Sequence, residues 1–410
     1  MTKGPQIEAA ASRQWSTSAL LMATTLVMAV AIPLCAQTPR VLRDGNSWVE
    51  ETTGNLAAAR EFRAFTDMGS VQVQGNGTQV SYVVRKRSYA TTEEAARRQF
   101  DQMRFSANKS GDSVVLEGRL TGRNVNRLTA EIVVQVPRLT QVVKVETRGG
   151  SLAFNSISGS IVGITGGGDV KLDEISGPVK ITSGGGVMEA GNVGSDLYLQ
   201  SGGGNVSVER VNGQLVVRTG GGRVHIGTSG GTSIDTGAGN IEINKCNGDL
   251  RANSGGGNLN LGEVYGTVLA ETGGGSVRLA SAQGGVRVIT GGGSVELYKV
   301  GESAQVETGA GAITVQFVAG QDKFKDSLLH TAAGNVIVYL PSNLGVSVHA
   351  STELANGKGI VSAFPGVAIS SEGGNYGPKS MFGEGQLNGG GPILRIRTTI
   401  GQIDIRRLQQ

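Results

Sequence analysis

Aromatic side chains are scarce in this sequence: Phe, Tyr and Trp make up only 4% of its 410 residues. A large core built from aromatic rings is therefore excluded. Charged residues are also few, at 17% against a usual value of about 25%. The 37 Lys and Arg residues nearly balance the 33 Asp and Glu residues. We therefore predict no nucleic-acid partner, and we interpret the cluster Arg85, Lys86 and Arg87 as a solvated strand end.

Long apolar runs are missing too, apart from one near the N-terminus. The run at residues 19–32 has 14 residues and follows a basic flank, whereas a membrane-spanning helix needs about 20. This pattern is typical of a secretory signal peptide. We predict that residues 1–36 are cleaved between Ala36 and Gln37 and that the product is exported to the periplasm, cell surface or extracellular space. Two alternatives remain: an uncleaved segment, which would be the protein's only membrane contact, and a lipid on Cys35.

Cysteine and histidine are equally rare, with two and three residues. After cleavage only Cys246 remains, so no intramolecular disulfide can form and the fold depends on packing. A lone exposed thiol would be a liability outside the cell, so we expect Cys246 to be buried as a small core residue. The histidines lack the ligand spacing of a zinc site. We predict no metal and no other cofactor.

Glycine, by contrast, is abundant, with 66 residues, and it is periodic. Triads of small residues, each preceded by Ser or Thr, recur at steps of 18, 18, 18, 17, 18, 18, 18 and 18 residues. So regular a spacing indicates a repeat architecture. The hydroxyl residues that open the triads are Thr165, Ser183, Ser201, Thr219, Thr236, Ser254, Thr272, Thr290 and Thr308. Weaker copies begin at Thr147 and Thr331.

Within each repeat, apolar and polar residues alternate with a period of two, which is typical of strands with one buried face. The unit from Thr165 has Val170, Leu172, Val179 and Ile181 at apolar positions. One unit holds only two short strands and cannot bury their apolar faces alone. Stacked coils with parallel strands about 4.8 Å apart bury them in continuous columns. The sequence therefore predicts an all-β fold, a two- or three-sided parallel β-solenoid with 18-residue coils and a right-handed path.

The triads have a structural explanation in this fold. Three glycines let the chain turn a corner with positive φ angles and let the next coil approach closely. By the alternation, the preceding Ser or Thr points inward. We expect these hydroxyls to stack as a ladder that hydrogen-bonds the backbone of the corners, each bond contributing about 0.5–1.5 kcal/mol.

The two flanks break the period. Residues 37–145 read as a β-rich N-terminal cap with one helix near residues 91–104, where Thr91 or Thr92 serves as the N-cap. Residues 146–320 form the solenoid. Residues 321–410 read as irregular terminal coils and a far cap, with a glycine-rich loop over residues 357–391.

Several segments resemble a bacterial family. They are residues 66–71 (TDMGSV), the strand end at residues 136–138 (VPR), the Thr-Gly-Gly-Gly units and residues 401–405 (GQIDI). The chain is similar over residues 60–408 to a β-strand-repeat domain of unknown function known as the putative-adhesin family. The resemblance implies an exported solenoid, and it supplies no catalytic residue to carry over.

A polysaccharide lyase or hydrolase is the alternative hypothesis, because stacked coils can display paired carboxylates. Asp173 and Glu209 occupy equivalent places two coils apart, and Glu189, Glu242 and His225 are further outward candidates. Solvated outer positions explain all five residues. We therefore predict a protein with no catalytic site and no enzyme activity.

A binding or scaffold role in the cell envelope agrees better with this pattern. A solenoid presents polar side chains at regular intervals, which suits an extended glycan or an envelope protein as partner. A purely structural protein that assembles with copies of itself is the remaining hypothesis.

Overall fold

Strands account for most of the chain in the computed structural model. The structure describes residues 39–122, 128–318, 320, 323–373 and 379–409. The predicted signal peptide and its cleavage site at Ala36 and Gln37 lie outside the described residues. The described residues form one compact unit. A search of the described residues finds no helix with the length and hydropathy to span a membrane.

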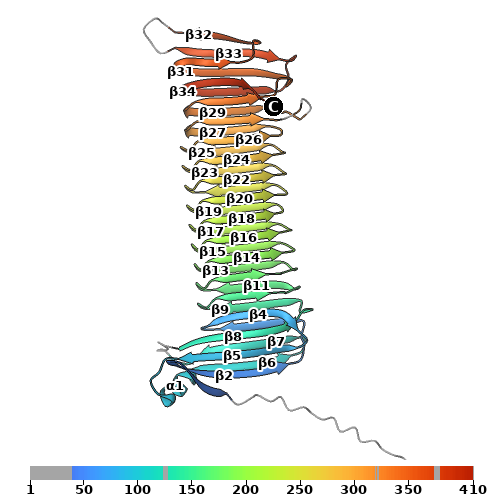
Figure 1. The fold of residues 1–410 in the computed structure, drawn as a ribbon, viewed down its shortest axis with the longest axis vertical. Helices are drawn as coiled ribbons and strands as arrows, with labels where there is room; N and C mark the ends of the chain where they lie inside the picture. The colour runs from blue at the N-terminus through green and yellow to red at the C-terminus, as the bar shows by residue number, and fades with distance from the viewer. Residues whose placement is uncertain (1–38, 123–127, 319, 321–322, 374–378, 410) are drawn as a thin grey trace, which may run out of the picture. The chain divides into compact units, whose positions relative to one another are not determined.

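Each repeat forms one coil of two strands, and each strand pairs in parallel with its equivalents in the coils before and after. Two ladders result, named here the odd and even ladders after the strand labels in Figure 1. The odd ladder contains β9 (Val142–Thr147), β11 (Ser160–Thr165), β13 (Val179–Ser183), β15 (Leu197–Ser201), β17 (Leu215–Thr219), β19 (Thr232–Thr236), β21 (Leu250–Ser254), β23 (Val268–Thr272), β25 (Val286–Thr290), β27 (Ala304–Ala310) and β29 (Ser327–Ala333). The even ladder contains β10 (Leu152–Asn155), β12 (Val170–Asp173), β14 (Met188–Val193), β16 (Val206–Val211), β18 (Val224–Ser229), β20 (Ile241–Cys246), β22 (Leu259–Val264), β24 (Val277–Ala282), β26 (Val295–Val300), β28 (Ile313–Phe317) and β30 (Val336–Leu340). The predicted all-β parallel solenoid is confirmed, and its repeated coils have two sides.

The core lies between the two ladders and consists of columns of aliphatic side chains. Val217, Ile234 and Ala252 follow one another in register on the odd ladder, and all three are fully buried. Burying each Val or Ile side chain stabilises the fold by roughly 1.5–3 kcal/mol, and every coil buries several such side chains. Cys246 is buried, as predicted, in register with Val264 of the next coil.

The N-terminal end pairs its strands out of sequence order. Its strands are β1 (Arg40–Asp44), β2 (Ser47–Leu56), β3 (Glu61–Thr66), β4 (Ser70–Gly77), β5 (Val80–Ser88), β6 (Met103–Ser110), β7 (Ser113–Leu120) and β8 (Leu128–Pro137). β3 lies in parallel between β7 and β9, and β4 lies in parallel between β8 and β10. β6, β5, β2 and β1 extend the two ladders in antiparallel pairing. The region predicted as a cap thus already contains parallel coils, but they are stacked out of chain order, so no 18-residue spacing marks them in the sequence.

The helix α1 (Glu93–Phe100) begins after Thr92, whose hydroxyl accepts a hydrogen bond from a first-turn backbone N–H at 3.3 Å. It is shorter than the predicted residues 91–104, because Met103 already begins β6. Met103 still packs in one small buried cluster with the helix residue Phe100. The apolar spacing therefore reported a real packing contact, shared between the helix and the strand that follows it.

The interpretation of Arg85, Lys86 and Arg87 as a solvated strand end is wrong for Lys86, whereas the side chains of Arg85 and Arg87 do reach solvent. The Lys86 side chain is only 10% exposed, and its Nζ lies 2.7 Å from Glu50 Oε1. Arg85 Nε lies 2.9 Å from Glu51 Oε2. The antiparallel pairing of β5 with β2 places these acidic and basic residues opposite one another, so the positive charge of the cluster is largely compensated.

At the C-terminal end, the last strand of the chain is again inserted between earlier ones. The strands here are β31 (Val346–Ser362), β32 (Val367–Glu372), β33 (Ser380–Leu387) and β34 (Ile393–Arg407). β34 pairs in parallel with β29 and β30 on one side and with β31 on the other, and antiparallel β33 and β32 complete the stack (Figure 1). The loop expected over residues 357–391 is wrong in part, because β33 pairs with β31 and β32 pairs with β33, so much of that segment is strand.

Candidate functional site

The nine Ser and Thr residues before the corner glycines form a buried column of hydroxyl groups. Thr272 shows the pattern: its hydroxyl donates to Gly257 O of the preceding coil at 2.8 Å and accepts from Gly275 N of its own corner at 3.3 Å. Each hydroxyl therefore joins its coil to the one before. The donated bonds measure 2.7–3.5 Å at Thr165, Ser183, Ser201, Thr219, Thr236, Ser254, Thr272, Thr290 and Thr308.

The hydroxyl column extends beyond the sequence repeat. Thr398 donates to Gly334 O at 3.0 Å, and Thr352 donates to Gly401 O at 3.2 Å. The glycine-triad pattern predicted neither residue. Thr398 precedes Gly401 by three residues, which is the spacing of the other corners, so this signal could have identified it. Thr352 has no glycine at that spacing and could be placed only by the pairing of β31 with β34.

The corner glycines permit close approach of successive coils. A Cβ on Gly255 would lie 1.9 Å from Gly237 O, and a Cβ on Gly257 would lie 2.1 Å from Gly239 O. The middle residue differs, since a Cβ on Gly256 would meet nothing within 4 Å. None of the three has a φ in the left-handed region. The expectation of positive φ angles at these corners is therefore wrong, and the need for glycine comes from the neighbouring backbone.

A second set of side chains links the coils on the outer surface. Asn240 Oδ1 accepts from Asn258 N at 2.9 Å, and Asn258 Oδ1 accepts from Ser276 N at 2.9 Å. At the opposite corner, Asp249 Oδ1 accepts from both the backbone N–H and the hydroxyl of Thr267 at 2.8 Å. These bonds, the backbone bond first, hold the pKa of the Asp249 carboxyl below its ordinary value. The sequence pattern showed only polar residues at these places.

The 17-residue coil contains a buried polar cluster. Thr232 stands in register between Leu215 and Leu250, where an apolar residue would continue the column. Its hydroxyl lies 2.5 Å from the hydroxyl of Ser229. Cys246 Sγ donates to the backbone carbonyl of Gly230 at 2.9 Å. The shorter coil thus places hydroxyl and thiol groups in the core, and each of them has a hydrogen-bond partner there.

Two of the carboxylates considered for catalysis, Asp173 and Glu209, project from the even ladder two coils apart. Asp173 Oδ1 accepts hydrogen bonds from Glu174 N at 3.0 Å and from Asn192 N at 3.4 Å. This carboxylate therefore caps a corner. Glu209 is exposed.

The other candidates for catalysis, Glu189, His225 and Glu242, stand in register on the even ladder, each at the second residue of its strand. His225 Nδ1 lies 3.4 Å from Glu242 Oε2 in the next coil, and Glu189 is exposed two coils before His225. This contact between adjacent coils accounts for His225 and Glu242. Among the described residues, no cluster of three or more His, Cys, Asp and Glu is placed to hold a metal ion.

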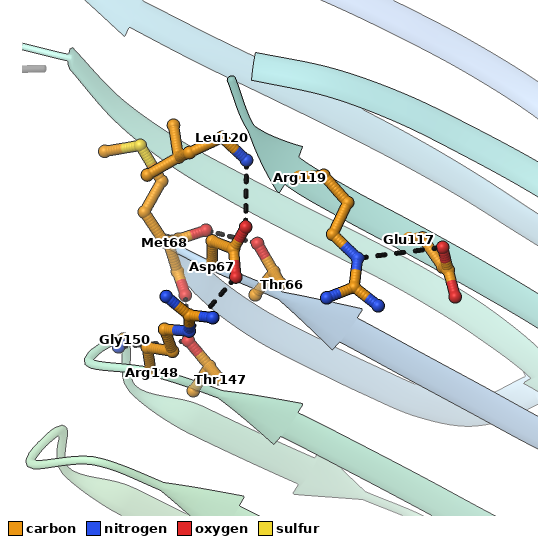
Figure 2. A network of polar contacts seen from close by, with 10 residues as sticks. Thr66, Asp67, Met68, Glu117, Arg119, Leu120, Thr147, Arg148 and Gly150 are labelled. Atoms are coloured by element: carbon orange, nitrogen blue, oxygen red, sulfur yellow. Dashed lines mark hydrogen bonds and ion pairs between the residues drawn. The ribbon is translucent and has the colours of Figure 1, made fainter. Parts of the chain in front are cut away.

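At the N-terminal coil, an ion pair takes the place of corner glycines (Figure 2). Asp67 follows Thr66 at the end of β3; its Oδ2 accepts from Leu120 N at 2.9 Å, and its Oδ1 lies 3.1 Å from Arg148 Nε. Asp67 is 9% exposed and Arg148 is 71% exposed. The Asp67 carboxylate thereby links β7 to β3. Thr147 continues the hydroxyl column by donating a 3.1 Å hydrogen bond to Gly69 O.

A groove of about 710 Å³ runs along the odd ladder beside the glycine corners. Its outward side chains belong to successive coils from β15 to β25, about 24 Å at roughly 4.8 Å per coil. We name it the corner groove. Its outward side chains are Gln200, Arg218, Asp235, Asn253, Glu271 and Ile289, with the backbone of Gly220, Gly237, Gly255 and Gly273 at its edge.

The polar groups in the corner groove are only partly paired. Asn253 Nδ2 donates to Asp235 Oδ1 at 2.8 Å, and Arg218 Nε lies 3.9 Å from Asp235 Oδ2. Asn253 Oδ1 is buried and accepts no hydrogen bond from the described residues. A buried acceptor without a donor costs about 1–3 kcal/mol.

No family model matches this chain, and no curated protein matches it. Solved structures that it is similar to include a putative cell adhesion protein from Clostridium sporogenes, at 10% identity, 90% coverage of this chain, 100% coverage of that chain and a TM-score of 0.20. A putative adhesin from Parabacteroides distasonis matches at 10% identity, 71% and 96% coverage and a TM-score of 0.26. A putative lipid binding protein from Parabacteroides distasonis matches at 11% identity, 89% and 98% coverage and a TM-score of 0.20. The adhesin names agree with the resemblance seen in the sequence, but likeness at this level carries no argument about activity or partners.

Proposed function

We propose that this chain is a non-enzymatic exported protein of the cell envelope that binds an extended glycan along the corner groove. The observation that carries the proposal is the regular placement of planar polar side chains, one per coil, in the order Gln200, Arg218, Asp235, Asn253 and Glu271. Amide, carboxylate and guanidinium groups donate or accept two hydrogen bonds in one plane. Pairs of neighbouring sugar hydroxyls match this geometry.

The groove supports a glycan better than an added peptide strand. Strand addition requires a free sheet edge, where backbone N–H and C=O groups are unpaired. The strands along the groove are paired on both sides by neighbouring coils, as β21 is by β19 and β23. Side chains, not backbone, therefore make the contacts here, and a partner with many hydroxyl groups satisfies them.

A glycan array with the chain from Gln37 onward tests the proposal. The double variant Asn253→Ala with Glu271→Ala removes two neighbouring groove contacts. The matched control, Asn260→Ala with Glu263→Ala, removes the same residue types from the exposed face of β22 on the even ladder. We expect the first variant to lose the array signal at least tenfold and the second to keep it.

A blank array for the unmodified chain, or equal loss in both variants, would contradict the proposal. A blank array together with a mass that rises with concentration in light scattering would support a self-assembling envelope scaffold instead. Turnover of any glycan during the same incubation would support a lyase or hydrolase.

A further inference from the structure

A second cavity lies on the even ladder near the C-terminal end, away from the corner groove. Its volume is about 680 Å³. Gln316, Tyr339 and Arg406 follow one another in register on β28, β30 and β34, and Tyr298 precedes them on β26. We name this cavity the tyrosine pocket. It is lined by Tyr298, Thr314, Gln316, Tyr339, Ala363, Arg406, Arg407, Leu408 and Gln409.

The two aromatic rings are held in place by their neighbours. The Tyr298 hydroxyl donates to Glu296 Oε2 at 3.2 Å, and the Arg278 guanidinium lies 5.5 Å from the centre of its ring. The Tyr339 hydroxyl accepts from Arg406 Nη1 at 3.3 Å. Burial, then the bond to Glu296, raises the pKa of Tyr298 above its ordinary value, so the phenol stays neutral. The rings are preorganised, which lowers the entropic cost of binding.

The spacing of the rings is set by the coils. Tyr298 and Tyr339 stand two coils apart with Gln316 between them, which is about 9–10 Å at the usual strand separation. This distance is close to one disaccharide of an extended β-linked glycan. Aromatic rings offer flat apolar faces for the C–H faces of sugars, and Thr314 and Gln316 supply donors and acceptors for hydroxyls.

The pocket also carries an uncompensated positive charge. Both charged residues that line it are arginines, and no Asp or Glu is among its described lining residues. Arg406 is neutralised by Asp404, with Nε 2.7 Å from Oδ2. Arg407 is exposed, its guanidinium lies 5.4 Å from the centre of the Phe364 ring, and it has no carboxylate partner among the described residues. A guanidinium stacked in this way leaves its N–H edge open for a bidentate carboxylate.

We infer that the tyrosine pocket binds a glycan segment that carries uronic acids: sugar faces contact Tyr298 and Tyr339, and a sugar carboxylate pairs with Arg407. Planar two-point recognition of a carboxylate favours uronate over neutral sugars. This site is separate from the corner groove, and the inference stands whether or not the groove binds.

Calorimetric titration with two related probes tests the inference. The probes are tetramannuronate, a β-linked uronate oligomer, and its methyl ester, which keeps the sugar rings and loses the charges. We expect the acid to bind at least tenfold more tightly than the ester, because a bidentate, charge-assisted pair with the guanidinium is stronger than a hydrogen bond to a neutral ester. Arg407→Gln should bring the affinity for the acid down to that for the ester. Tyr339→Ala should weaken both probes at least tenfold, and Tyr339→Phe should retain most of the affinity.

The matched controls lie on the odd ladder. Tyr198 is an outward tyrosine flanked by Lys180 and Arg218, with cation-to-ring distances of 5.4 and 6.0 Å. Arg287 is exposed. We expect Tyr198→Ala and Arg287→Gln to leave both affinities unchanged. Absence of binding at millimolar acid, equal binding of acid and ester, or equal losses in the control variants would overturn the inference. The corner-groove variant Asn253→Ala with Glu271→Ala should leave this binding intact, so the two proposals fail independently.

Discussion

Replacing single corner glycines by alanine should have opposite effects at adjacent positions. Gly256→Ala adds a methyl group to open space, whereas Gly257→Ala places a Cβ 2.1 Å from Gly239 O and 2.5 Å from Gly239 C. Ordinary van der Waals contact begins at 3.4 Å. The obstacle is backbone of the preceding coil, so no side-chain rotation relieves it.

The magnitude follows from the ladder geometry. Relief of the Gly257→Ala clash needs a local separation of more than 1 Å between coils that are about 4.8 Å apart. Such a shift breaks bonds like Ser254 Oγ to Gly239 O, now 2.9 Å. Overpacking costs about 1–3 kcal/mol and each lost bond about 0.5–1.5 kcal/mol. We therefore expect a loss of about 2–4 kcal/mol. Gly256→Ala should gain about 0.4–1 kcal/mol by restricting the unfolded chain.

Three coils of this chain already carry the tolerated change, because Ala238, Ala310 and Ala333 occupy the middle position of their triads. Urea unfolding of the chain from Gln37 onward, followed by far-UV circular dichroism, gives the order of midpoints. Long repeat arrays depart from two-state behaviour, so amide exchange at Leu259 should accompany it as a local probe. If Gly257→Ala proves as stable as Gly256→Ala, close approach is not the reason for glycine at that position.

Three further predictions concern the polar contacts between coils. Thr272→Val leaves the N–H and C=O of two corners unpaired and should cost about 1–3 kcal/mol in urea unfolding, while the outward Thr182→Val should cost far less; equal costs would contradict the hydroxyl column. The pKa of the Asp249 carboxyl is lower in the folded protein than in the unfolded chain. The stability that this carboxylate contributes is therefore present above the unfolded pKa of about 3.9 and is lost as pH falls through the folded pKa. In Asp249→Asn the urea midpoint should fall less on acidification than in the unmodified chain, and an unchanged pH profile would refute this. Asp67→Ala should leave the Leu120 N–H without its acceptor and lower the free energy of unfolding by about 1–3 kcal/mol. Arg148→Ala should lower it by less than about 1 kcal/mol, because this arginine is exposed. Thermal unfolding measures both variants, and the reverse order of stability would contradict the prediction.

The repeated part of the fold was accessible from the sequence because each coil repeats the same local rule. Inward alternation, the hydroxyl before the glycines and the burial of Cys246 all follow from the strand period and the 18-residue step. Only part of the reason for the corner glycines could be predicted from the sequence. Close approach follows from stacking, but the backbone angles of a corner such as Gly255 depend on the coil beside it.

The ends of the stack were not accessible in the same way. β34 pairs with β29 and β30, whose paired residues precede its own by 67 positions, and no repeat period in the sequence indicates a contact between strands so far apart in the chain. The same holds for Thr352 in the hydroxyl column. The position of Lys86 was misread because its partner Glu50 is brought opposite it by antiparallel pairing of β2 with β5, two strands that are separated in the chain by β3 and β4.

The candidate binding sites lie between these cases. The sequence period places the outward residues Asn253 and Glu271 on one face. The groove that they line also depends on how the glycine corners fold, which the period does not predict. The tyrosine pocket needed the structure, because Arg407 comes from a strand inserted out of order.

The central functional claim is that an extended chain of sugars lies across several coils at once. Affinity as a function of oligosaccharide length tests it most directly, with a series prepared from whichever polymer scores in the glycan array. Our account predicts that affinity rises with each added sugar until the oligosaccharide spans the corner groove, about 24 Å at roughly 4.8 Å per coil, and then levels off. A monosaccharide that binds as tightly as the longest oligosaccharide would contradict it.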